Sequence, residues 1–306
     1  GQGCAGARRL DGQVTTAQGH PRLTGPLVVS GLTCKAGGLH LAGARIGMDA
    51  RGDTGLDGGE LLLDLSPARL ATAQGAARAV SGHGRLTVRG GRLAAGWTLT
   101  GQGVTLPGLV ARELGVEGRI SGGADLTHAT AEGSFSGAGV APDAATMATM
   151  AHWQQSAQGT FAAPLIARLA QGMQREGVAS KLEGTWTLRR GAHGASLVLP
   201  MARWAGPRAH LDGSRLMVAG GGITGNLALT GGDLPRVNVR VAPIRGGQSA
   251  ELVVAPWSAD GAAITVPRLR IAERDGRVEM AGQVMVSGPV PGGAVRDLDL
   301  PIAGDW

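Results

Sequence analysis

PDAATMATMAHWQQSAQGTFAAPLIARLAQGMQREG, residues 142–177, is the one long stretch whose pattern predicts helix. Asp143 is a residue type that caps a helix start, because its side chain accepts a hydrogen bond from a backbone N–H of the first turn. Met147, Met150 and Ala151 follow it at helical spacing. The first part of the stretch therefore predicts a helix that begins just after Asp143.

The second part of the stretch predicts another helix. Pro164 suits a first turn, where no backbone donor is needed, and Leu165, Leu169 and Met173 repeat every four residues. Gly177 is a typical stop signal. We expect two helices that are joined near Gln158–Thr160 and lie on or across the apolar side of a sheet. His152 and Trp153 are expected to pack against that sheet.

Short strands are predicted on both sides of the helical pair. The organisation is a first β-run at 1–141, the helices at 142–177 and a second β-run at 178–306. Apolar and polar residues alternate in segments bounded by glycine, which is typical of half-buried strands. At about 15 residues for each strand and turn, the chain holds roughly 18 to 20 strands. Only the segment at Ser66–Pro67 reads differently, as a short helix through Leu70.

The fold class expected is mainly β: an elongated, curled, antiparallel-type sheet that forms an open apolar groove. One helical pair cannot cover so long an apolar face, so the sheet either folds on itself or leaves a long concavity. The residues predicted to line the groove are Leu61, Leu63, Leu65, Leu86, Val88, Trp97, Leu99, Trp186, Leu188, Ile223, Leu227, Leu229, Val237, Val239, Val241, Met280 and Val284. The arginines that alternate with them are predicted to lie on the convex, wet side: Arg85, Arg89, Arg189 and Arg240.

A degenerate repeat of the form apolar, any, Gly, any, apolar runs through both β-runs. Its copies are VEGRI (116–120), AEGSF (131–135), LEGTW (182–186), ITGNL (223–227) and MAGQV (280–284). The glycine falls on the apolar face each time. Such a glycine lets the sheet bend or lets another group approach the backbone.

Composition limits the function classes. The chain has 54 Gly, no Tyr and two Phe, and all but two of its 29 basic residues are arginine. The arginines are scattered and not clustered with aromatics, so codon usage in a GC-rich genome explains them better than nucleic-acid binding. The chain begins at Gly1 and ends within an alternating pattern, so we expect 1–306 to be a fragment of a longer protein. Any membrane anchor would lie outside it.

The two cysteines, Cys4 and Cys34, fit no zinc motif. Two interpretations stay open at this point: a single disulfide in an exported protein, or two unrelated buried thiols. We predict an oxidising compartment and a pair close enough to bridge.

Catalytic motifs are absent from the sequence. The seven histidines form no HxxxH or HExxH pair, GSFSG (133–137) has the wrong register for a nucleophile elbow, and neither lysine lies in a phosphate-binding loop. We expect no enzymatic activity, no cofactor and no metal.

The glycine-punctuated strands, the LSPARL phrase at 65–70 and the mid-chain helical pair resemble the AsmA-like superfamily of bacterial envelope proteins, which includes TamB. Within it the chain is most similar to the YdbH-like branch, sometimes labelled "dicarboxylate transport". The resemblance implies a taco-shaped β-groove in the periplasm of a Gram-negative bacterium that conducts phospholipid between the inner and outer membranes. It also implies an inner-membrane anchor outside this fragment and an outer-membrane partner protein.

The residues agree with the resemblance on one point. Acyl chains need apolar surface and no directional polar contacts, so a lipid conduit leaves no catalytic motif. The alternative is a secreted structural or adhesive β-helix protein. Stacked β-helices favour polar ladders, and the chain has only two Asn, at positions 226 and 238.

Overall fold

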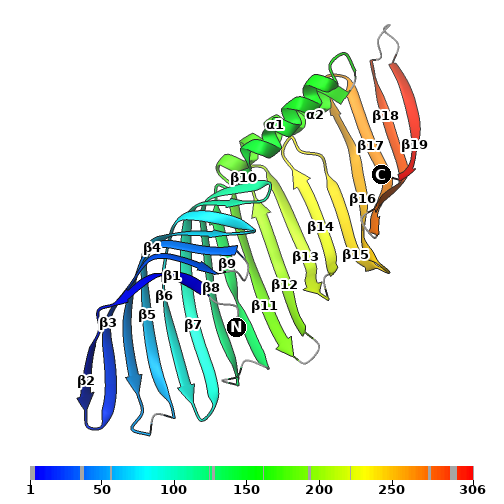
Figure 1. The fold of residues 1–306 in the computed structure, drawn as a ribbon. Coiled ribbons are helices and arrows are strands. Elements are labelled where there is room, and N and C mark those ends of the chain that lie inside the picture. The colour runs from blue at the N-terminus through cyan, green and yellow to red at the C-terminus, as the bar shows by residue number, and fades with distance from the viewer. Residues whose placement is uncertain are drawn as a thin grey trace. The chain divides into compact units, whose positions relative to one another are not determined.

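The chain is mainly β, as Figure 1 shows for its computed structural model, in which 75% of the chain is strand. The structure describes residues 4–34, 38–55, 57–123, 125, 128–160, 162–191, 194–220, 222–274, 277–289 and 295–305. Neighbouring strands run antiparallel, and within the described residues one pair of helices interrupts them. The predicted fold class, mainly β and antiparallel with one helical pair, is therefore confirmed.

The elements follow one another as a β-run, two helices and a second β-run. They are β1 (Cys4–Leu10), β2 (Gln13–Ala17), β3 (His20–Cys34), β4 (Leu39–Gly52), β5 (Gly59–Thr72), β6 (Gly75–Arg89), β7 (Arg92–Leu106), β8 (Leu109–Gly123), β9 (Ala129–Ala138), β10 (Ala141–Pro142), α1 (Ala144–Ser156), α2 (Ala162–Val178), β11 (Lys181–Gly191), β12 (Gly194–Ala205), β13 (Ala209–Ala219), β14 (Gly222–Gly231), β15 (Val237–Ile244), β16 (Gly247–Ala259), β17 (Ala262–Arg274), β18 (Arg277–Pro289) and β19 (Val295–Asp305).

The contacts divide the chain into two compact units. Unit 1 comprises Gly1–Ala138 and Thr185–Ala195, and unit 2 comprises Gly139–Gly184 and Ser196–Trp306. The division does not follow the two β-runs. Residues 185–195 of the second run belong to unit 1, and the helices belong to unit 2.

Unit 1 is a ladder of antiparallel hairpins in sequence order, from β3 to β9. At its first edge β1 and β2 both pair with β3, one after the other. Cys4 of β1 lies opposite Cys34 of β3, and a disulfide joins them with a Cα–Cα distance of 4.1 Å. The bridge ties the first strand, in which every residue is exposed, to the sheet.

Unit 2 pairs its strands in the same way, from β12 to β19, and carries both helices. α1 begins after Asp143, whose side chain accepts a hydrogen bond from the backbone N–H of Thr146 at 2.7 Å. α1 ends at Ser156 and α2 begins at Ala162, so the predicted two helices and their junction are confirmed.

The position predicted for the helices is wrong. α2 packs against the ends of strands and their turns: Leu165 lies in a cluster with Ala259 and Ala262, at the β16–β17 turn. Figure 1 shows the helices along this edge of the unit 2 strands, and not over a face. Trp153 of α1, expected to pack on the sheet, is 56% exposed.

The helix predicted at Ser66–Pro67 is also wrong, because β5 runs through both residues. The pairing of β5 with β6 shifts register between Leu65 and Ala68, so the proline lies in an irregular step of the strand. Proline lacks the N–H that a regular ladder position uses, and a bulge tolerates it. The LSP phrase therefore marks a break in pairing and not a helix start.

The buried core is thin and made of small side chains. In unit 1, Val29, Ala44 and Ala68 form one buried cluster, on which Leu27 and Leu65 pack. Most larger apolar residues of the sheet stay partly exposed.

Candidate functional site

The apolar face of unit 1 consists of three rows of side chains that cross the strands. The register places the members of each row opposite one another, so all three rows lie on one side of the sheet. The first row is Leu23, Ala50, Leu61, Leu86, Ala95, Ile120 and Ala131; the second is Gly25, Met48, Leu63, Gly84, Trp97, Gly118 and Gly133; the third is Leu27, Ile46, Leu65, Gly82, Leu99, Val116 and Phe135. None of these residues carries a charge.

All nine lining residues predicted in unit 1 lie on this face. Register and alternation place Leu61, Leu63, Leu65, Leu86, Val88, Trp97 and Leu99 there. Trp186 contacts Trp97, and Leu188 follows two positions later on the same strand. None of the nine is buried, and Leu99 and Leu188 are 38% and 37% exposed. The sheet thus presents an open apolar surface.

The opposite face of unit 1 carries the charges. Arg22 and Arg51 bind Asp49 at 2.8 and 3.1 Å, and the hydrogen bond from Arg22 is the main reason that the pKa of Asp49 lies far below its usual range. Arg85 pairs with Glu60, and Arg119 binds Glu132 at 2.6 Å. Arg85 and Arg89 therefore lie on the side opposite the predicted lining. Arg189 alternates with Leu188 in the same way.

Unit 2 has an apolar face of its own. Leu227 lies opposite Val239, Val239 opposite Leu252, and Leu252 opposite Leu269. Register and alternation place all eight lining residues predicted in this unit on that face: Ile223, Leu227, Leu229, Val237, Val239, Val241, Met280 and Val284. None is buried, and Ile223 is 45% exposed.

The other face of unit 2 again holds the ion pairs. Arg203 binds Asp212 at 2.8 Å, and Arg268 pairs with Glu251. Arg240 lies opposite Glu251 and Asn226, on this side. The ion pairs named above therefore lie on the face opposite the apolar rows in each unit, although Glu273 of β17, opposite Val278, lies on the apolar side of unit 2.

Two tryptophans meet on the apolar face of unit 1. Trp97 of β7 and Trp186 of β11 have ring centroids 6.0 Å apart at an interplanar angle of 32°. Gly118 and Gly133 lie between them in the second row. A Cβ on Gly118 would stand 2.6 Å from both indoles, so these repeat glycines admit the rings.

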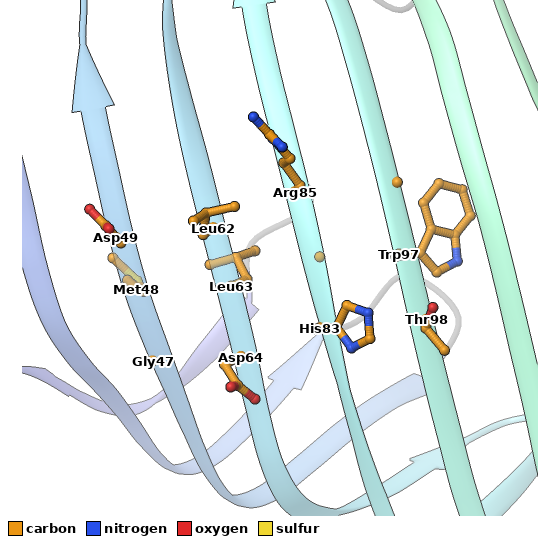
Figure 2. A pocket seen from close by; sticks show the side chains of 12 residues that line it. Gly47, Met48, Asp49, Leu62, Leu63, Asp64, His83, Arg85, Trp97 and Thr98 are labelled. Carbon is orange, nitrogen blue, oxygen red and sulfur yellow. The ribbon is translucent and has the colours of Figure 1, made fainter.

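Hollows lie on both sides of the unit 1 sheet. On the apolar face, Val14, Leu23, Leu61, Leu86 and Val88 line a hollow of about 430 Å³. A larger one, of about 730 Å³, crosses β4 to β7, and Figure 2 shows its lining. Its polar lining residues, including Asp49, Asp64, His83, Arg85 and Thr98, alternate along the strands with Met48, Leu63 and Trp97. The larger hollow therefore lies on the charged face.

A second polar feature attaches α2 to the strand ends of unit 2. Glu176 is fully buried, and its Oε2 accepts hydrogen bonds from the backbone N–H groups of Arg208 and Ala209 at 2.8 and 3.0 Å. Nearby, Asp233 binds Arg175 at 2.5 Å and Arg208 at 2.7 Å. The hydrogen bond from Arg208 is the main cause that lowers the pKa of Asp233.

Neither this cluster nor the contact between the two tryptophans was predicted from the sequence. Glu176 follows Gln174 and Arg175 near the end of α2. A glutamate among such polar residues is normally exposed, so the sequence gives no sign that this one is buried. Trp97 and Trp186 are far apart in sequence. The five-residue repeat is the sequence feature that could have indicated their contact. Its copies VEGRI, AEGSF and LEGTW place Gly118, Gly133 and Trp186 on the same face of the sheet.

Among the described residues, no group of three or more His, Cys, Asp or Glu side chains is placed to hold a metal ion. Neither described helix has the length and apolar character needed to span a membrane. Comparison with protein-family models, with curated proteins and with solved structures gives no match.

Proposed function

We propose that the chain is a non-enzymatic lipid carrier that conducts phospholipid acyl chains along the apolar faces of its units. One observation carries the proposal: each unit presents an apolar face that spans many neighbouring strands, and the larger side chains on that face stay partly exposed. Large exposed apolar surfaces of this kind mark interaction sites. Hydrocarbon chains suit it because they need apolar contact and no hydrogen-bond partner.

The proposed location is the periplasm, between an inner membrane to which the protein is anchored and an outer membrane with a partner protein. The Cys4–Cys34 disulfide supports an oxidising compartment. The resemblance to AsmA-like envelope proteins supports the two membranes. The pairing of consecutive strands as antiparallel hairpins favours the carrier over the β-helix alternative, whose stacked coils run parallel.

Photocrosslinking in unit 2 tests the proposal, because neighbouring strand positions point to opposite faces. A photoreactive residue replaces Leu227 on the apolar face or Arg240 on the charged face. The protein is irradiated in its native membrane extract and analysed by mass spectrometry. We expect phospholipid adducts at Leu227 and not at Arg240.

A matched pair of substitutions gives the second part of the test. Val239→Asp places an unpaired carboxylate on the apolar face, and Asn238→Asp places the same group next to it on the opposite face. Desolvating an unpaired carboxylate costs several kcal/mol, so Val239→Asp should lower the adduct at Leu227 by more than about tenfold. Asn238→Asp should not. Absence of adducts at Leu227, or equal adducts at Arg240, would refute the carrier function.

A further inference from the structure

Three aromatic side chains gather on the apolar face of unit 1, and we call them the aromatic patch: Trp97, Phe135 and Trp186. Trp97 and Trp186 meet directly. Phe135 lies two positions after Gly133 on β9, in the neighbouring row and on the same face. The whole chain has only six Trp and two Phe, so this concentration sets the patch apart from the aliphatic rows around it.

The sheet is adapted to hold the two indoles low over its backbone. A Cβ on Gly118 would lie 2.6 Å from Cζ2 of Trp97 and of Trp186. A Cβ on Gly133 would first meet the neighbouring backbone, 2.0 Å from the carbonyl oxygen of Glu117, and would lie 2.8 Å from Cζ2 of Trp186. Gly84 occupies the same row two strands away, and its Cβ would meet nothing closer than 3.6 Å. The close fit of the rings to the backbone is therefore specific to Gly118 and is not shared by every glycine of the row.

The polar group of one ring is already engaged. Trp186 Nε1 donates a hydrogen bond to the carbonyl oxygen of Ser134 at 3.4 Å. Because this hydrogen bond occupies the only polar group of the Trp186 side chain, the rest of the ring can contact an apolar ligand. Both indoles remain partly exposed, and no charged residue lies in the three rows. The surroundings thus match an uncharged hydrocarbon, and they would leave a charged or hydrogen-bonding ligand without partners.

We propose that the aromatic patch is the holding site of unit 1, where a phospholipid tail binds more tightly than on the aliphatic rows to either side. This inference rests on the proposed carrier function and names a specificity-determining site within it. Rigid aromatic rings provide a large contact area with few rotatable bonds, so they lose little conformational entropy on binding. The tail crosses the strands along the rows and lies flat on the indoles.

Crosslinking beside the patch tests the inference. A photoreactive residue replaces Leu99, which is 38% exposed and lies in the row next to Trp97. Phospholipid adducts are counted in this background and after Trp97→Leu with Trp186→Leu. We expect the double substitution to lower adducts at Leu99 by about tenfold, while adducts at Leu227 of unit 2 stay unchanged.

Two glycine variants test the same inference if the double tryptophan variant does not fold. Gly118→Ala must displace both indoles, and Gly84→Ala has room for the added methyl group. Adducts at Leu99 should fall in Gly118→Ala and persist in Gly84→Ala, and circular dichroism should show that both variants retain their strands.

The possible outcomes separate this inference from the proposed function. If Leu227 is labelled and the adducts at Leu99 do not respond to Gly118→Ala or to the tryptophan substitutions, the holding site is refuted and the carrier function stands. If neither Leu227 nor Leu99 is labelled in the otherwise unchanged protein, both proposals fail. A protein–protein crosslink at Leu99 in place of lipid would also overturn the holding site, because a second copy would then cover the patch.

Discussion

Glu176 is the residue whose environment is least typical of its chemistry. Its side chain is fully buried, Oε2 accepts two backbone hydrogen bonds, and Oε1 has no hydrogen-bond partner among the described residues. Arg208 provides the nearest opposite charge, with Nε 3.6 Å from Oε1. Gly206 and Gly232 leave room for the carboxylate, since a Cβ on either would lie within 3 Å of it. One acidic side chain thus joins α2 to two strand ends.

Removing this carboxylate should loosen α2. Glu176→Ala removes the acceptor of two backbone N–H groups, the buried one of Ala209 and the part-buried one of Arg208. We therefore expect a loss of about 2 kcal/mol in the local stability of α2. Hydrogen exchange of the α2 amides measures it. Gln174→Ala, an exposed change on the same helix, should alter that stability by less than about 0.5 kcal/mol. Equal effects of the two substitutions would show that the buried hydrogen bonds do not hold the helix.

Single residues also show where sequence reasoning ends. Alternation was enough to place Leu63 and Leu227 on apolar faces, because it depends only on the two-residue period of a strand. It could not place Trp97 beside Trp186, since that contact depends on strand order and on the space above Gly118. The burial of Glu176 likewise depends on a turn that follows β12, more than 30 residues away in sequence.

Among the elements, the strands and helices were predictable where the local pattern is long. The ends of α1 and α2 followed from a capping aspartate and apolar spacing. The helix prediction at Ser66–Pro67 was wrong because a proline suits both the start of a helix and a β-bulge. Only the pairing of β5 with β6 distinguishes the two. The site of α2 on strand ends was also hidden, because its buried Leu165 meets small residues of a turn, Ala259 and Ala262, that carry no docking signal.

β1 is the element that depends most on a single bond. All of its residues are exposed, so apolar burial holds it only weakly, and its pairing with β3 includes a register shift at Ala7/Arg8. The disulfide closes a segment of 30 residues and restricts the detached state. We expect reduction to speed hydrogen exchange of the β1 amides by at least about tenfold and to leave β5 to β7 unchanged.

A variant with Cys4→Ser and Cys34→Ser provides the control. Its exchange should match that of the reduced protein and should not respond to reductant. If oxidised and reduced protein exchange at the same rate in β1, the backbone pairing with β3 is sufficient by itself.

For the molecule as a whole, the separation of charge by face predicts that the folded protein binds an apolar dye. Leu62 and Leu63 are neighbours on β5 with side chains on opposite faces, so they offer a matched comparison. Leu63→Asp should reduce the fluorescence of bound anilinonaphthalene sulfonate, because it places a charge on the apolar face of unit 1. Leu62→Asp joins a face that already carries Asp64 and Arg85 and should have little effect.

Phospholipid should compete with the dye in the unmodified protein. Both variants should keep the strand content of the parent by circular dichroism, since neither position is buried. Equal loss of dye binding in the two variants would contradict a one-sided apolar surface.

The hairpin order of unit 1 has a consequence for how such proteins change length over evolution. Among the described residues, β4 to β7 each pair only with the strand before and the strand after in sequence. Gain or loss of one hairpin adds or removes two strands, about 10 Å of every row, and restores the chain direction. Gain or loss of a single strand would instead reverse the chain direction of every strand that follows it. Related chains should therefore differ by even numbers of strands, and the distance that they span should vary in steps of one hairpin.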